Sequence, residues 1–346
     1  MKKKEFEDIY RSVFNDSNEW RRWFFDDVVT DDSQIYLSRE SSGKATGALL
    51  MQPYDFLFHG RTVPSEYMSC VATRPEARAR GIASGLIREA LRSARERGVA
   101  VCHLVPASDH LYFFYDRLGF ATTFYVDRER YTSLHTFEAG GFVPVEPSYA
   151  IFSRLERAYG CGVLHSAANF ANLLADNNLD EGRIVAVRST DGSEAILFAT
   201  EVDGLVRVKC LLADNCDAAE AALAQLRDLA GEVAIMVERP PLSGENCFLR
   251  PYGMARIVDP MPLLGAIAAE HPGLNYAIYV KDPMIEVNTG YYTIRDGECR
   301  KPVAFGGHSD LEVRIDTLAA VLFSNERIGK VLELPVRRPY MTLMLD

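Results

Sequence analysis

The sequence predicts an α/β (α+β) chain in which mixed sheets carry flanking helices, and three observations support this fold class. The length of 346 residues fits two or three domains. Segments with alternating apolar residues are interleaved with segments of helical spacing. The order of these segments in the first third then repeats faintly further along the chain. We therefore expect a first domain at 1–145, a similar but degenerate domain at 146–255 and a third domain at 256–346.

The first domain has the clearest pattern. Residues 4–28 predict two amphipathic helices, and alternation in 34–38 and 47–51 around a polar turn predicts a hairpin. A further strand leads into a helix, because the apolar residues between Ala83 and Ala94 recur at the i, i+3, i+4 spacing of one helix face. Another strand and a short aromatic helix complete this part.

The later elements are read in the same way. Paired strands are expected at 195–199 and 205–212, a helix at 218–229 and a strand at 232–238. This order resembles that of the first domain, although an unrelated α/β segment is the alternative. From residue 256 the pattern changes to a helix, two strands and two more helices, which predicts a domain of a different kind.

Composition and charge narrow the class of protein. A formal net charge of −10 argues against a general nucleic-acid surface and is compatible with a cationic amine substrate. No apolar stretch reaches the roughly 18 residues of a membrane span. Seven cysteines are scattered singly, as expected in a reducing compartment such as the cytoplasm. The histidines and cysteines show no zinc-site spacing, so we expect no metal.

The segment that joins the strand at Val71 to the following helix has the chemistry of an anion site. The first N–H groups of a helix have no partner within the helix, and the helix dipole favours negative charge there. Gly81 has no side chain and Ala83 has only a methyl group, so that a pyrophosphate can approach the backbone closely. Arg78 and Arg80 add positive charge. Taken alone, Arg-x-x-Gly-x-Ala is a common pattern, and a plain strand-to-helix turn is the alternative.

The order of two motifs gives this loop a more specific meaning. The loop is followed by a helix, a strand and then Phe114-Tyr115-Asp116-Arg117-Leu118-Gly119-Phe120. This combination resembles the GNAT acetyltransferase superfamily, in which the first motif holds the pyrophosphate of acetyl-coenzyme A and the second flanks the thioester. The resemblance implies that acetyl-coenzyme A is held by Val71, Ala72, Thr73, Arg78, Ala79, Arg80, Gly81, Ile82, Ala83 and Ser84, with Ser108 and Asp109 near a further contact.

The wider layout resembles the enhanced intracellular survival (Eis) family of acetyltransferases. The GNAT motifs, the segment from Asp282-Pro283 to Asn288-Thr289-Gly290 and the apolar C-terminus from Pro339 carry this resemblance. It implies a catalytic GNAT domain, a degenerate GNAT-like domain and a C-terminal domain with a sterol-carrier-protein fold. It also implies direct transfer of acetyl to an amine in a ternary complex.

Three groups are candidates for the proton transfers. Tyr115 is the candidate general acid, since a phenol with an ordinary pKa of about 10 stays protonated at neutral pH; simple packing within its aromatic run is the alternative. Glu66 is a candidate base, with an exposed strand carboxylate as the alternative reading. The resemblance adds the terminal carboxylate of Asp346 as a second candidate base, because it implies that the C-terminus enters the active site. The alternative is that the tail is a strand that completes the C-terminal sheet. Water alone is also a sufficient base.

Two functions of different classes follow. The first is an N-acetyltransferase acting on a small-molecule or peptidyl primary amine. We expect no nucleic-acid partner and no membrane span for it, and a homo-oligomer is possible. The second is a lipid- or small-ligand-binding protein whose acetyltransferase domain is vestigial. The intact loop at 78–83 together with Tyr115 favours the enzyme, because a vestigial domain is free to lose both.

Overall fold

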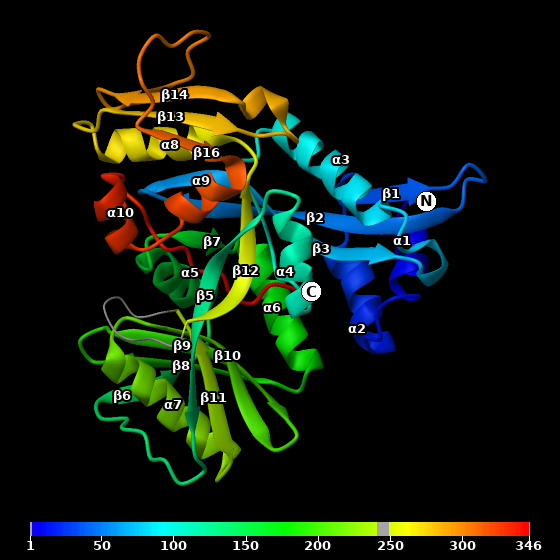
Figure 1. Cartoon of the computed structure of the whole chain (residues 1–346). Helices are drawn as coiled ribbons and strands as arrows, with labels where there is room; N and C mark the ends of the chain where they lie inside the picture. The colour runs from blue at the N-terminus through cyan, green and yellow to red at the C-terminus, as the bar shows by residue number, and fades with distance from the viewer. Residues whose placement is uncertain (1, 241–248, 346) are drawn as a thin grey trace.

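The computed structural model describes residues 2–240 and 249–345. Within these residues, twelve strands form one mixed sheet and four more strands form a second sheet. Figure 1 shows the blue and cyan N-terminal part, the green middle part below it and the yellow-to-red C-terminal part above. The predicted α/β class with mixed sheets and flanking helices is therefore confirmed.

The N-terminal part follows the predicted order of elements. Residues 4–28 form two helices as expected, although the second continues as a short π-helical turn. The antiparallel strands β1, β2 and β3 are followed by α3, which crosses to β4, and β4 runs parallel to β3. Helix α3 buries the apolar face read from the sequence. The elements are α1 (Lys2–Tyr10), α2 (Asn18–Trp23), η1 (Phe24–Val28), β1 (Ile35–Arg39), β2 (Ala45–Phe58), β3 (Arg61–Thr73), α3 (Ile82–Glu96), β4 (Val101–Leu104), α4 (Asp109–Asp116) and β5 (Ala121–Tyr131).

The middle part repeats the topology of the first. Strands β8, β9 and β10 are antiparallel neighbours, and α7 crosses from β10 to the parallel strand β11. This is the arrangement of β1, β2, β3, α3 and β4, so the expected tandem architecture is present. The elements are β6 (Phe142–Val145), α5 (Tyr149–Ala158), β7 (Gly162–Leu164), α6 (Ala167–Leu179), β8 (Arg183–Ser189), β9 (Glu194–Val202), β10 (Leu205–Ala213), α7 (Cys216–Ala230) and β11 (Ala234–Arg239).

One strand does not follow the linear division of the chain. Strand β12 (Arg250–Ile257) begins in the range assigned to the second domain and ends in that of the third, yet it lies between β4 and β5 of the first and is antiparallel to both. Strand β5 pairs with β12 along its first half and with β11 along its second half. The first and middle parts therefore share one continuous sheet, and a cut at residue 145 would divide it.

The C-terminal part is a four-stranded sheet in the order β15–β14–β13–β16 with helices beside it. It is not a separate body, because Phe323 packs against Phe56 and Phe58 of β2, with ring centroids 5.4 Å apart in both pairs. The elements are α8 (Pro260–Glu270), β13 (Tyr276–Lys281), β14 (Gly290–Arg295), β15 (Glu298–Arg300), β16 (Leu311–Arg314), α9 (Ile315–Leu322) and α10 (Glu326–Leu332).

A fully buried ion pair joins the N-terminal sheet to the C-terminal part. Arg256 of β12 donates from Nη2 to Oδ1 of Asp282 over 2.8 Å, and both side chains are 0% exposed. The other oxygen of Asp282 accepts from Nδ2 of Asn288 over 3.0 Å. Asp282 and Asn288 belong to the segment that carries the sequence resemblance of the C-terminal domain, and its role here is to receive Arg256.

The apolar C-terminal tail is buried, as its composition predicts. Tyr340 donates from its backbone N–H to the carbonyl of Cys161 and accepts from the N–H of Val163, each over 3.0 Å. The tail therefore pairs beside β7 of the middle part, and the alternative of a strand completing the C-terminal sheet is wrong. Gly162 permits this contact, because a Cβ there would lie 2.1 Å from the Tyr340 carbonyl oxygen. The red tail in Figure 1 accordingly runs into the centre of the molecule.

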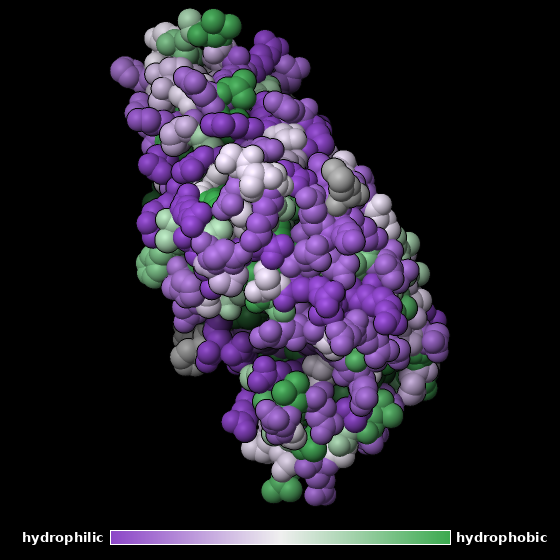
Figure 2. All heavy atoms as spheres, turned by 90° about the vertical axis from the view of Figure 1, so that its right-hand side faces the viewer, coloured by the Kyte–Doolittle hydropathy of each residue, from purple (hydrophilic) through white to green (hydrophobic). Residues whose placement is uncertain are grey.

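The surface is mainly polar on the face shown in Figure 2. Hydrophilic residues predominate there, and apolar residues are scattered among them. None of the helices in the described ranges has the length and apolar character needed to cross a membrane. The six cysteines whose positions are described form no disulfide with one another.

The buried ion pair makes a testable prediction for stability. Asp282→Ala leaves the Arg256 guanidinium buried without its counter-charge, so the free energy of unfolding should fall by about 3–5 kcal/mol. Glu298→Ala is the matched control, because it breaks an ion pair with Arg300 that is largely exposed and worth at most about 1 kcal/mol. Urea unfolding monitored by circular dichroism measures both, and equal losses in the two variants would contradict the assigned role.

Candidate functional site

The site is built where β3 and β4 stop pairing. These parallel strands share a ladder only between Ser65–Tyr67 and Val101–His103. On its other side β3 stays paired with β2, and a bulge between the pairs Leu50–Ser69 and Ala48–Ala72 leaves Cys70 with a left-handed φ of +52°. Beyond Tyr67, the edge of β3 that faces β4 has no strand partner in the described chain. Val71, Ala72 and Thr73, predicted to contact the cofactor, lie on this free segment.

The loop before α3 exposes a run of unpaired backbone donors. Within the described residues, none of the N–H groups from Ala79 to Ser84 donates to a carbonyl or a side chain. The left-handed conformations of Ala79 (φ +62°) and Gly81 (φ +74°) turn the chain sharply into the helix. Gly81 is the N-cap and provides no side-chain acceptor. The predicted residues Arg78–Ser84 therefore form an open site for an anion at the positive end of α3.

Two arginines accompany these donors. Arg78 donates from Nε to the carbonyl of Thr73 over 3.4 Å, and Arg80 donates from Nη2 to the carbonyl of Glu76 over 3.1 Å. Both side chains are exposed, and Arg80 also forms a long ion pair of 3.4 Å with Glu40. These weak tethers leave both guanidinium groups beside the loop, where they add positive charge to the anion site.

The equivalent position in the middle part is already filled. Asn215, the N-cap of α7, accepts from the N–H of Ala218 over 2.8 Å. Its neighbour Asp214 forms an ion pair with Arg154 and accepts from the N–H of Glu194. A side-chain cap and a carboxylate at this helix start disfavour a phosphate.

Tyr115 lies in the apolar cluster that connects the free segment of β3 to α3 and α4. Its side chain is 6% exposed and packs in the same cluster as Val71 and Ile82. No other residue of the described ranges forms a hydrogen bond with its hydroxyl. Burial raises the pKa of this phenol well above its ordinary value, and the neighbouring Cys102 adds to the rise. Tyr115 is thus a packed residue that keeps a protonated, unpartnered hydroxyl.

Ser108 and Asp109 begin the helix that carries Tyr115. Ser108 is the N-cap of α4 but its side chain accepts no capping bond, and its Oγ lies 3.2 Å from Nδ1 of His110. The start of this second helix is therefore also left uncapped. No hydrogen bond or ion pair connects these two residues to the loop at 78–84 in the described structure.

Glu66 has a structural partner. Its carboxylate is 7% exposed and receives Nη2 of Arg97 at 2.7 and 2.8 Å. Burial raises the pKa of Glu66, and the Arg97 guanidinium opposes that rise. The reading of Glu66 as an exposed strand carboxylate is wrong. Its bidentate bond to the last turn of α3 also leaves it poorly placed to accept a substrate proton.

The tail reaches the sheet from the face opposite Tyr115. Alternation along β4 puts Cys102 in the cluster of Tyr115, and Val101 in the cluster that contains Met344. Asp346, the third catalytic candidate, lies outside the described residues.

A buried histidine was missed by sequence reasoning. His103 is fully buried on β4, its ring stacks on Tyr67 with centroids 5.6 Å apart, and its Nε2 lies 3.3 Å from Oγ of Ser65. Burial, together with nearby His165, lowers the pKa of His103 to about 3, so this ring stays neutral. The available signal was a single polar residue inside the apolar run Val101–Leu104.

The comparisons with known families agree with this geometry. Residues 2–123 match the acetyltransferase (GNAT) domain, and residues 264–334 match the sterol carrier protein domain. The chain therefore contains a GNAT acetyltransferase domain and a C-terminal sterol-carrier-protein-like domain, and both predictions are confirmed. No curated protein matches the chain.

Solved structures share the fold over nearly the whole chain. A GCN5-related N-acetyltransferase from Kribbella flavida has 18% identity and a TM-score of 0.76, with 99% of this chain and 95% of that chain covered. Another from Anabaena variabilis has 16% identity and a TM-score of 0.74, covering 98% and 96%. Eis1 from Mycobacterium abscessus has 15% identity and a TM-score of 0.69, covering 96% and 90%. At these identities the similarity establishes the fold.

The open loop predicts how coenzyme A binding responds to a single charge. Gly81→Glu places a carboxylate and a side chain against the anion site, so the affinity for coenzyme A should fall more than tenfold. Gly98→Glu is the control, because Gly98 has a similar left-handed φ of +83° but lies just after the other end of α3. Calorimetric titration measures affinity, and circular dichroism checks folding. Unchanged affinity in folded Gly81→Glu would refute the phosphate-loop assignment.

Proposed function

We propose that this chain is an Eis-like N-acetyltransferase that transfers acetyl from acetyl-coenzyme A directly to a primary amine. One observation carries the proposal: six consecutive backbone N–H groups, from Ala79 to Ser84, have no acceptor in the described structure. They stand at the start of a helix within a GNAT acetyltransferase domain. A pyrophosphate supplies the acceptors and the negative charge that this helix start requires.

The free edge of β3 can bind the pantetheine arm of the co-substrate. The amide groups of a pantetheine arm pair with unpaired strand backbone in the way another strand would. Val71 and the N–H of Thr73 offer such backbone, and the Thr73 carbonyl accepts only the long 3.4 Å bond from Arg78. This path leads from the loop at 78–84 toward the bulge at Cys70. A backbone N–H near the bulge can polarise the thioester carbonyl.

The chemistry needs one proton donor for the leaving group. The neutral amine nitrogen attacks the thioester carbonyl carbon, the C–S bond breaks, and the departing thiolate takes a proton from the Tyr115 hydroxyl. Water then returns a proton to the phenolate. The position of Tyr115 supports this assignment, because its hydroxyl stays protonated and has no hydrogen-bond partner within the described residues.

The amine proton has two acceptors in this proposal, water and the terminal carboxylate of Asp346. The buried tail up to Leu345 supports the second, since it approaches the sheet on the face that Tyr115 leaves free. A carboxylate there would bind an ammonium group and take its proton. Glu66 is the weakest candidate, because Arg97 already holds both of its oxygens. The amine that receives the acetyl group belongs either to a small molecule or to a peptidyl lysine.

The acid role predicts a kinetic phenotype for Tyr115→Phe. Loss of the hydroxyl should slow the chemical step about 10²- to 10⁴-fold with little change in affinity for coenzyme A. Tyr112→Phe, one turn earlier on α4, is the matched control. Because burial raises the pKa of Tyr115, the phenol stays protonated to higher pH, so its deprotonation should not lower the wild-type rate below about pH 10. A thiol-release assay measures the rates. If the rate of Tyr115→Phe is within threefold of the wild-type rate, Tyr115 has only a packing role.

The tail makes a second kinetic prediction. Deleting Met344–Asp346 should abolish turnover while binding of acetyl-coenzyme A is retained. Because Met344 and Leu345 are buried, this deletion can also loosen the fold. Appending three glycines after Asp346 is the cleaner variant, since it keeps every tail side chain and displaces only the terminal carboxylate. Full activity in the glycine-extended enzyme would exclude the carboxylate from catalysis.

A further inference from the structure

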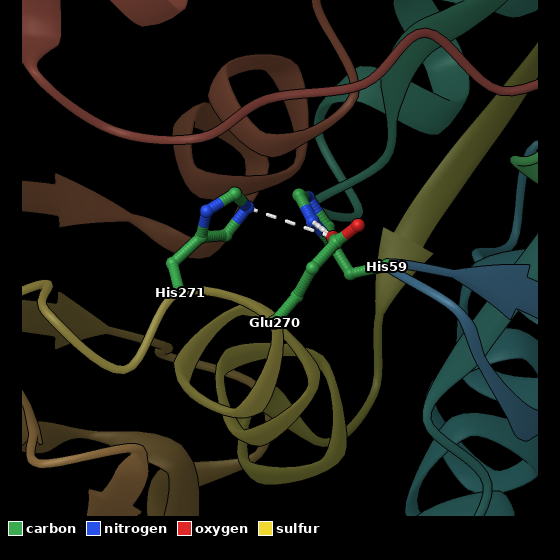
Figure 3. A group of neighbouring side chains, drawn as sticks. All are labelled: His59, Glu270 and His271. Carbon is green, nitrogen blue, oxygen red and sulfur yellow. Dashed lines mark hydrogen bonds and ion pairs between the residues drawn. The ribbon is translucent and has the colours of Figure 1, made fainter.

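Three side chains from distant parts of the sequence meet at the junction of the N-terminal and C-terminal parts. His59 stands at the turn between β2 and β3, whereas Glu270 and His271 stand at the end of α8. Their nearest nitrogen and oxygen atoms all lie within 4.8 Å of one another. Figure 3 shows the two imidazole rings next to each other, each joined by a dashed line to the Glu270 carboxylate, and their centroids are 5.4 Å apart.

The hydrogen bonds of this group leave two buried imidazole nitrogens without a partner, Nε2 of His59 and Nε2 of His271. His59 Nδ1 is hydrogen-bonded to Oε2 of Glu270. His271 Nε2 lies 3.5 Å from that same oxygen, has no hydrogen-bond partner in the described structure and is shielded from water. A buried polar atom without a partner costs free energy. A bond from this nitrogen to a cation beside Oε2 would remove that cost.

The other oxygen of Glu270 is held by a cation of the protein. Arg337 donates from Nη2 to Oε1 over 3.0 Å. Carboxylates that bind metals are commonly oriented in this way by an outer hydrogen-bond donor. The contact fixes the rotation of the carboxyl group and leaves Oε2 directed at the two imidazoles.

The group is reachable from solvent. His59, Glu270, His271 and Arg337 line an open pocket of about 820 Å³, whose opposite wall is formed by α10 and the segment after it. His59 is 3% exposed, but the other two ligand side chains are half-buried. An ion can therefore enter, and a water molecule has room to complete its coordination.

We infer that His59, Glu270 and His271 form a zinc site. Two imidazoles and one carboxylate, with a fourth position left to water, are a donor set that Zn²⁺ takes in proteins at distances of about 2.0–2.2 Å. The ion takes the place of the hydrogen bond between His59 Nδ1 and Glu270 Oε2, and those two atoms move apart to admit it. The site ties the β2–β3 turn to α8. Through Arg337 it also fixes the chain three residues before Tyr340 enters the core.

Zinc titration of the purified full-length chain tests this site. After removal of metals by a chelator, calorimetry with zinc chloride should show one equivalent bound, and the same addition should raise the midpoint of thermal unfolding. His271→Ala should weaken zinc binding at least tenfold and remove the thermal shift. This variant is expected to fold, because His271 is half-exposed and ends its helix. His308→Ala is the matched control, an exposed histidine of the same C-terminal part, and it should bind like wild type.

The outcomes are separable from those for acetyl transfer, since neither readout uses activity. No saturable binding of zinc would overturn the site. Equal affinity in His271→Ala and wild type would overturn it as well, because the ion would then bind elsewhere, for example at the exposed thiol of Cys216. A one-equivalent site that is lost in His271→Ala and kept in His308→Ala establishes it.

Discussion

The buried ion pair between Arg256 and Asp282 is the constraint on which the arrangement of the three parts depends. Each charge has left water and is compensated only by the other and by nearby hydrogen bonds, so neither can move away alone without a large cost. Arg256 lies on β12, which separates β4 from β5. Asp282 lies in the C-terminal part. The pair therefore sets where β12 stands in the sheet and where the C-terminal part docks.

The contact between the N-terminal and C-terminal parts anchors α3 at its C-terminal end only. Arg95, in its last turn, binds Asn288 and Asp259, and Arg92 donates to the carbonyl of Met284. The first turn of α3 has no side-chain cap, and its donors stay open. A helix anchored at its C-terminal end presents a rigid anion site at the other end. The C-terminal part thus supports the anion site through α3.

Local sequence patterns were sufficient for the loop, α3 and the burial of the tail. Gly81 is needed for its left-handed turn, and the spacing of apolar residues defines the face of α3, so both can be read from a few consecutive residues. The partners of Glu66 and His59 could not be read in this way. Arg97 lies 31 residues from Glu66, and Glu270 lies 211 residues from His59. Only the folded sheet decides that these ordinary residue types meet.

Burial of apolar side chains explains why the tail leaves water, but the topology of the fold decides where the tail packs. Its apolar residues had to leave water, but nothing in them selects β7 over the C-terminal sheet; that choice depends on Gly162, whose missing side chain admits Tyr340. Arg337 is held by Glu270 just before this point. The position of the chain end thus depends on contacts with α8 and β7, and α8 in turn contacts the β2–β3 turn. If the terminal carboxylate accepts the amine proton, acetyl transfer therefore requires the complete fold, including parts that never touch the co-substrate.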